Sequence, residues 1–201
     1  MISFEQTPNV FSPEIELQNN LTKLREKIHT EMNDEIKKRL ETNPNPTEEE
    51  LRAGAFNEWI EPQARDAVFE MLKKGYGTQS SGFYGEHNEF QAVDGYFTVD
   101  EETIKKLKAM GVQVLRGPEL DLPQNKLITQ IRFYPKEADL QKIKEQWGAI
   151  AITLPKKDGP LGICDRVEEF REEYAPNHPS FEQDRKTYFD KIRKEAGVEK
   201  E

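Results

Sequence analysis

The sequence contains very few of the residues that carry metal, cofactor and disulfide chemistry. Its 201 residues include one cysteine, Cys164, and three histidines. A single cysteine cannot form an intramolecular disulfide, which favours a reducing compartment and excludes zinc sites built from several cysteines. No two histidines show the H-x-x-x-H spacing of a helical metal site. We therefore expect no metal and no cofactor, and we interpret Cys164 as a small, partly buried residue at a helix start.

Long apolar runs are also missing. No stretch has the length needed to cross a bilayer, and the first residues lack the basic and apolar regions of a signal peptide. Charged residues make up 33% of the chain, and the net charge of −9 disfavours unspecific binding to phosphate backbones or anionic lipids. These absences predict a soluble, cytoplasmic protein that does not bind membranes and for which nucleic acid is a disfavoured partner.

The clearest pattern that is present lies between about residues 90 and 154. Alternating or continuous apolar residues predict four strands, at Phe90–Val99, Val112–Leu115, Lys126–Tyr134 and Ala149–Leu154. Helical spacing predicts a helix after Asp100, ended by Gly111, and a second from about 136 to 147, ended by Gly148. This order predicts an α+β protein with a ferredoxin-like βαββαβ core, in which two helices cover one face of an antiparallel sheet. A different α+β arrangement of the same elements is the alternative.

Three helices are predicted before this core. Ser12 and Pro13 are typical of an N-cap and a first helical position, and they open an amphipathic helix that reaches about Thr42. Its narrow apolar stripe suits packing within the chain, which we favour, or a coiled-coil seam with a partner. We divide the chain into an N-terminal helical region (1–75), the α+β core (76–160) and a C-terminal helical extension (161–201), which together form one compact unit. The helix 13–42 and a sheet edge are the candidate surfaces for a protein partner or self-association.

The segment Gly75–Glu89, GYGTQSSGFYGEHNE, differs from ordinary helix and strand composition. Glycines let a ligand approach the backbone, and hydroxyl groups can bind phosphate or carboxylate oxygens. The segment nevertheless matches no nucleotide-binding loop and no nucleophile elbow, so a linker or an edge strand is the alternative. The candidate ligand-binding residues, taken together with two from the neighbouring strands, are Gly77, Thr78, Ser80, Ser81, Tyr84, Tyr96 and Arg132. The candidate catalytic residues are Ser80, Ser81, His87 and Asp94, although an exposed turn also explains His87.

Polar residues of the first and third predicted strands should share one face of the sheet. In a ferredoxin-like sheet these strands are adjacent, which would bring Asp94, Tyr96, Gln130, Arg132 and Tyr134 together. Asp94 and Arg132 could then form a cross-strand ion pair. We expect the N-terminal helices to cover this face. The alternative is a ligand surface of the kind on which RNA-recognition domains stack bases, although the aromatic RNP1 pattern is absent.

Three functions follow from these features. We favour a noncatalytic binding or protein-interaction module, since no established catalytic constellation is recognisable. The first alternative is a hydrolase or transferase that acts on a phosphorylated metabolite at the Gly75–Glu89 segment. The second is RNA binding on the polar sheet face. The sequence leaves open whether the protein is an enzyme, because a ferredoxin-like fold serves many unrelated tasks.

Overall fold

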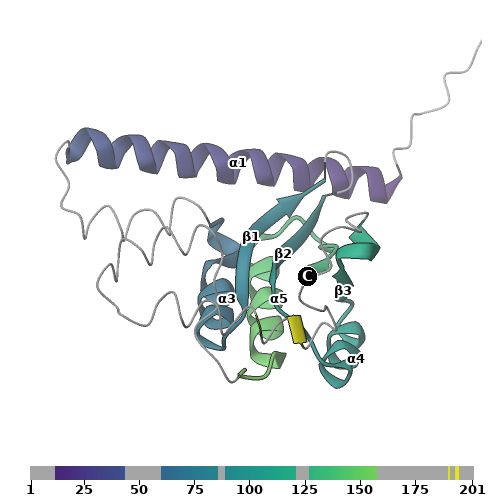
Figure 1. Cartoon of the computed structure of the whole chain (residues 1–201). Coiled ribbons are helices and arrows are strands. Elements are labelled where there is room, and N and C mark those ends of the chain that lie inside the picture. The colour runs from purple at the N-terminus through teal and green to yellow at the C-terminus, as the bar shows by residue number, and fades with distance from the viewer. Residues whose placement is uncertain are drawn as a thin grey trace, which may run out of the picture.

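A four-stranded antiparallel sheet forms the centre of the computed structural model (Figure 1). The structure describes residues 12–43, 60–85, 89–120, 127–157, 190 and 193–194. The strand order is β1-β2-β4-β3, and the strands are β1 (Gly77–Tyr84), β2 (Phe90–Tyr96), β3 (Gln113–Arg116) and β4 (Ile128–Phe133). The predicted α+β class is confirmed, and β2 and β4 are the two central strands, as expected.

Two of the helices begin where their N-caps predict, whereas the helix expected from about residue 136 begins at Leu140, after its N-cap Asp139. The described helices are α1 (Pro13–Thr42), α3 (Pro62–Lys73), α4 (Glu101–Ala109) and α5 (Leu140–Thr153), with a 3-10 helix η1 (Gly117–Leu120) after β3. Ser12 and Asp100 cap α1 and α4 by accepting backbone N–H groups of the first turn. The predicted helix between residues 43 and 62, and most of the C-terminal extension, lie outside the described residues, so three N-terminal helices are not confirmed.

The prediction was wrong about the strand at 149–154, which forms the last turns of α5. Gly148 does not end the helix but lies inside it. The buried side chains Ile143, Trp147, Ile150 and Leu154 continue one helical stripe through the glycine, whereas Ile152 is 81% exposed. A covered strand would have buried Ile152, so the apolar run belongs to an amphipathic helix.

The fourth strand of the sheet comes instead from the Gly75–Glu89 segment. Here β1 forms the edge beside β2, with Ser81 opposite Val93 and a register shift between Thr78 and Ser80. The edge-strand alternative for this segment is therefore confirmed. The expected βαββαβ unit appears as βαββα, with its remaining strand placed before it in the chain, and the ferredoxin-like topology is not confirmed.

One face of the sheet, here called the inner face, packs against α3 and α5. Phe133 and Trp147 meet edge to face, with ring centroids 5.0 Å apart, and both are fully buried. The amide oxygen of Gln91 accepts hydrogen bonds from the Trp147 indole at 2.9 Å and from Gln63 at 3.3 Å. Since Gln63 belongs to α3, this helix shares the layer of α5, and the expectation that the N-terminal helices cover the opposite face is wrong for α3.

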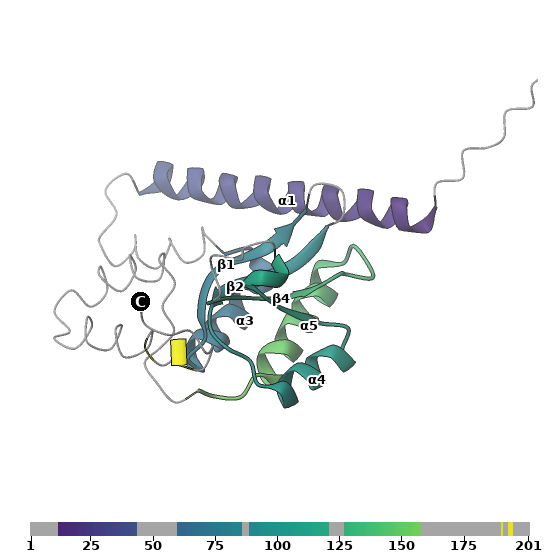
Figure 2. The same cartoon turned by 45° about the vertical axis from the view of Figure 1, so that its right-hand side comes forward.

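Helix α1 runs across the end of the sheet where β1 and β2 are joined (Figure 2). Arg25 donates to the carbonyl oxygen of Gly85 at 2.7 Å and forms an ion pair with buried Glu89 at 3.3 Å. Leu21 and Ile28 of the apolar stripe are buried in the core. The middle of α1 therefore packs within the chain. None of the described helices combines the length and the apolar character needed to span a bilayer.

Candidate functional site

The face of the sheet opposite α3 and α5, here called the outer face, gathers most of the predicted site residues. Side chains alternate along a strand and directly paired residues point to the same side. Tyr84 lies opposite Phe90, Ser80 opposite Asp94, and Asp94 opposite Gln130. Tyr96, Arg132 and Tyr134 share this side by the same alternation. The prediction that β2 and β4 place these polar and aromatic residues on one face is confirmed.

Three aromatic rings form a row across three adjacent strands of the outer face. Tyr84 and Phe90 stack with ring centroids 5.7 Å apart, and Phe90 and Tyr134 lie 5.6 Å apart at a tilted angle. The guanidinium carbon of Arg132 lies 5.3 Å from the Phe90 ring and 5.9 Å from the Tyr134 ring. We call these four residues the aromatic row. Rings and guanidinium stabilise one another by stacking and cation–π attraction, so their geometry is set before any partner arrives.

Next to the aromatic row, Asp94 is the centre of a hydrogen-bond cluster. One carboxylate oxygen lies 2.9 Å from both the Ser80 hydroxyl and the Tyr84 hydroxyl, and the other accepts from the Gln130 amide at 2.8 Å. The Tyr84 and Ser80 oxygens are also 2.7 Å apart. The cluster joins β1, β2 and β4, and the carboxylate of Asp94 accepts three hydrogen bonds within it.

The electrostatics of this cluster do not create a nucleophile or a general base. Burial, and next the negative charge of Asp94, raise the pKa of the Tyr84 phenol well above its usual range. The phenol therefore stays protonated at neutral pH and acts as a donor. Ser80 has a carboxylate and a phenol as neighbours but no histidine or lysine within the cluster, whereas hydrolases that use serine pair it with such a base.

Arg132 does not form the cross-strand ion pair that the sequence suggested. Asp94 lies directly opposite Gln130, while Arg132 lies opposite Ala92. The Nε of Arg132 donates instead to the Gln113 side chain at 2.8 Å. Among the described residues Arg132 has no carboxylate partner.

The other predicted site residues do not join this cluster. Ser81 alternates with Ser80 and therefore lies on the inner-face side of the edge strand, opposite Val93. Gly77 and Thr78 begin β1 beyond the register shift, and Thr78 is buried. His87 lies outside the described residues. The ligand-binding set thus separates into an outer-face group, with Ser80, Tyr84, Tyr96 and Arg132, and a remainder with no shared surface.

Sequence analysis missed Phe90, which is the middle of the aromatic row. Its alternation with Ala92, Asp94 and Tyr96 was enough to place it on the outer face. Its importance depends on Tyr84, which lies opposite only because β1 pairs with β2. The alternation in the sequence therefore indicated on which face Phe90 lies, but not that β1 pairs with β2 and brings Tyr84 beside it.

A second polar cluster surrounds Glu61 at the open edge of β1. The buried carboxylate of Glu61 accepts the backbone N–H of Phe83 at 3.1 Å and the amide of Gln63, and lies 2.8 Å from the His29 ring. Gly82 leaves the space for it, since a Cβ there would come within 2.5 Å of the Glu61 carboxyl carbon. The cluster supplies an acceptor for a backbone N–H of the edge strand, so we interpret it as structural.

Within the described part of the chain, no group of acidic, histidine or cysteine residues could hold a metal ion. No model of a known protein family, no curated protein and no solved structure matches this chain.

Proposed function

We propose that the protein is a noncatalytic binding module that recognises another protein through the outer face of its sheet. The observation that carries this proposal is the aromatic row, in which Tyr84, Phe90 and Tyr134 lie side by side and the guanidinium of Arg132 lies over the last two rings. Tyrosine, phenylalanine and arginine are enriched at the centres of protein interfaces, and arginine and tyrosine are frequent among their hot spots.

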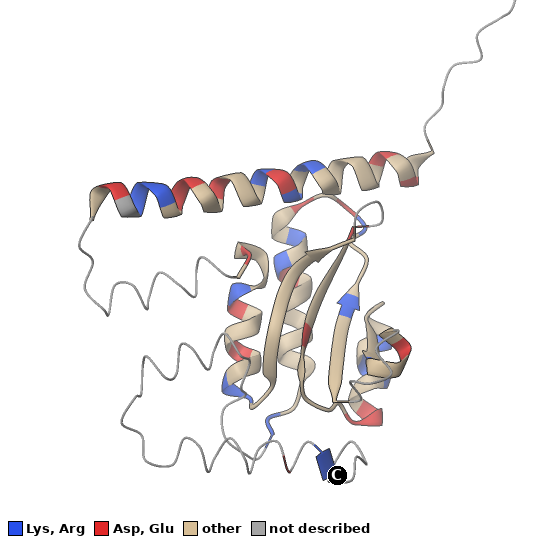
Figure 3. Ribbon diagram, turned by 45° about the horizontal axis from the view of Figure 1, so that its top comes forward, with Lys and Arg blue, Asp and Glu red and all other residues tan. Residues whose placement is uncertain are grey.

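The outer face differs in composition from the rest of the described surface. Figure 3 shows charges of both signs along α1 and α4, whereas the strands carry almost none. The helix charges form exposed pairs such as Lys27–Glu31 and Lys106–Glu102, which are typical of solvated helix surfaces. The depletion of charge around an aromatic cluster supports a recognition role for the outer face, since interface centres show the same depletion.

A hydrolase or transferase at the same place has less support. Ser80, Tyr84 and Asp94 do come together, as a catalytic site would require. However, Tyr84 is held in its protonated form and the carboxylate of Asp94 already accepts three hydrogen bonds. A cluster whose carboxylate and hydroxyl groups bond one another suits a scaffold that positions the aromatic row better than it suits proton transfer.

The aromatic row also favours one alternative, the stacking of nucleic-acid bases. Against it, Arg132 is the one cation among the described outer-face positions of β1 to β4, and the chain has a net charge of −9. Affinity for single strands comes largely from phosphate contacts by several lysines or arginines. We therefore place protein recognition first.

The experiment compares two surfaces of similar chemistry on opposite sides of the molecule. The outer-face variant carries Arg132→Ala and Tyr134→Ala. The control carries Phe69→Ala and Lys73→Ala, which remove an exposed aromatic ring and the ammonium group 4.2 Å from its centroid on α3. A protein partner captured by the wild type and then purified should bind the outer-face variant at least about tenfold more weakly and the control normally. Equal binding to all three proteins would contradict the proposal.

A further inference from the structure

On the outer face, the acceptors of Asp94 have hydrogen-bond partners within the fold, whereas some donors of Arg132 and Tyr134 have none among the described residues. Asp94, the one carboxylate of this face among the described positions, accepts from Ser80, Tyr84 and Gln130. These three donors leave little capacity for a cation or an N–H group from a partner. Most of the acceptor positions of this carboxylate are therefore used within the fold.

Within the aromatic row, Tyr84 also donates into the Asp94 cluster, whereas Arg132 and Tyr134 keep donors that no described residue accepts. A guanidinium has five N–H groups, and Arg132 uses its Nε for Gln113. The hydroxyl of Tyr134, two residues along the same strand side, makes no hydrogen bond with any described residue, and this side chain is 38% exposed. The aromatic row therefore offers donors in excess and calls for an acceptor that carries negative charge.

We propose that the partner docks a segment whose aspartate or glutamate carboxylate binds Arg132, while a neighbouring apolar side chain contacts Phe90 and Tyr134. This inference rests on the proposed function and specifies the chemistry of the partner. Guanidinium and carboxylate match as two parallel charge-assisted hydrogen bonds. Contacts with Gln113 and with both rings hold the guanidinium in place, which reduces the entropy lost on binding.

The charge balance argues against the other partner classes. A basic segment that contacted the two rings would meet the like charge of Arg132. A polyanion would find one guanidinium and a chain of net charge −9. A single carboxylate beside an apolar side chain satisfies the free donors and the rings together.

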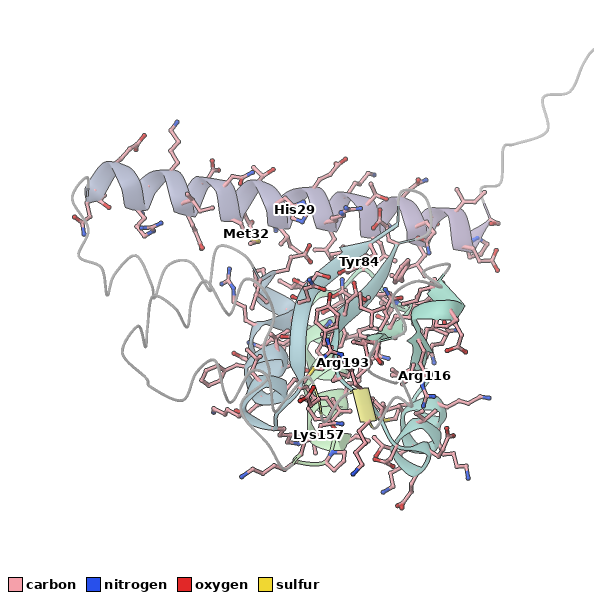
Figure 4. The ribbon with its side chains drawn as sticks, in the orientation of Figure 1. His29, Met32, Tyr84, Arg116, Lys157 and Arg193 are labelled. Atoms are coloured by element: carbon pink, nitrogen blue, oxygen red, sulfur yellow. The ribbon has the colours of Figure 1, made fainter. Side chains whose placement is uncertain are left out.

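The test is a selection from random peptides displayed with blocked C-termini, so that every carboxylate is a side chain. It is made on the wild type, on Arg132→Glu and on the control Arg116→Glu. Arg116 is exposed on β3 opposite Thr129, and Figure 4 shows it on the side of α4, far from Tyr84. Wild type and Arg116→Glu should select peptides with an aspartate or glutamate next to an apolar residue. Arg132→Glu should select lysine or arginine at that place.

A selected peptide then gives the size of the effect. Replacing its aspartate by asparagine, or its glutamate by glutamine, should weaken binding to the wild type by about tenfold to a hundredfold. The same change should have little effect on binding to Arg132→Gln. This variant keeps the side chain uncharged and similar in length, so it decides the test even if Arg132→Glu does not fold.

The outcomes separate this inference from the function on which it rests. Peptides that need Tyr134 but show no acid preference would overturn the carboxylate proposal and leave the binding module standing. Peptides that bind without Tyr134 and Arg132 would overturn both. If a single-stranded oligonucleotide bound more tightly than the selected peptides, and Arg132→Gln abolished that binding, the partner would be a nucleic acid and not an acidic protein segment.

Discussion

The two faces of this sheet treat their polar groups in opposite ways. On the inner face, Gln91 is fully buried and its amide oxygen is fixed by Trp147 and Gln63. On the outer face, Asp94 gathers three donors, but Arg132 and Tyr134 keep donors that no described residue accepts. The helix-covered face puts its polar groups out of reach of another molecule, even the amide nitrogen of Gln91, which has no partner among the described residues. A polar group on a half-exposed face can instead meet a binding partner. The comparison therefore separates residues that build the protein from residues with which it can bind.

The largest expected difference in stability is between substitutions at two neighbouring residues that lie on opposite faces of the sheet. Phe133 is fully buried against Trp147, and Tyr134 points to the outer face. Phe133→Ala should lower the free energy of unfolding by about 3–5 kcal/mol, because it leaves a cavity in the core. Tyr134→Ala should change it by less than about 1 kcal/mol. Urea unfolding of both variants measures the difference, and equal losses would show that the outer face is part of the core.

The next largest loss of stability should come from Glu61, which lies beside the edge strand β1. Glu61→Ala leaves the N–H of Phe83 and the amide of Gln63 without their acceptor at the edge of β1. We expect a loss of about 2–3 kcal/mol in unfolding free energy. Glu70→Ala, which removes an exposed partner of Lys73, should cost less than about 0.5 kcal/mol. If Glu61→Ala were as harmless as Glu70→Ala, the edge of β1 would not depend on this carboxylate.

The outer face should show its own pH dependence through Tyr84. Burial beside Asp94 raises the pKa of the folded-state phenol above its unfolded value of about 10. The resulting stability is complete below that pH and is lost as the pH rises toward the raised folded value, because the unfolded chain ionises first. Tyr84→Phe should cost about 0.5–1.5 kcal/mol at neutral pH, and its deficit should shrink in alkali.

The measurement is the difference in unfolding free energy between wild type and Tyr84→Phe at neutral and at alkaline pH. Tyr134→Phe serves as the control, since it removes a phenol hydroxyl that makes no hydrogen bond with a described residue. A deficit of Tyr84→Phe that stayed constant up to strongly alkaline pH would contradict a raised pKa.

Sequence reasoning reached the faces of the strands but not their register. The period of two placed Asp94 and Arg132 on one side, since alternation alone decides which face a residue occupies. A shift of two residues between strands keeps every side chain on its face, so alternation cannot tell whether Asp94 lies opposite Gln130 or Arg132. The ion pair failed for this reason, while the shared face was confirmed.

Glycine explains both why the β1 segment was left open between loop and strand and why the end of α5 was misassigned. The residues of β1, GTQSSGFY, contain two glycines and four hydroxyl side chains, so their weak apolar alternation allowed a loop as readily as an edge strand. In α5, Gly148 was interpreted as a stop, although Ile150 and Leu154 continue the stripe of Ile143 and Trp147. Glycine weakens a helix but does not end one whose apolar face is buried on both sides of it.

The smallest predicted change in the free energy of unfolding concerns Gly148 in α5. It tests whether α5, which covers the inner face, is continuous through this glycine. Gly148 has helical neighbours on both sides and open space where a Cβ would lie, whereas Gly111 ends α4 with a φ of 76°. Gly148→Ala should therefore raise the free energy of unfolding by about 0.5–1 kcal/mol. Gly111→Ala should lower it by about 1 kcal/mol, because alanine is strained in the left-handed region. Both sites are open to an added methyl group, so opposite signs in thermal or urea unfolding would isolate backbone conformation as the cause. Destabilisation by Gly148→Ala would mean that α5 does not run through residue 148 as an unbroken helix.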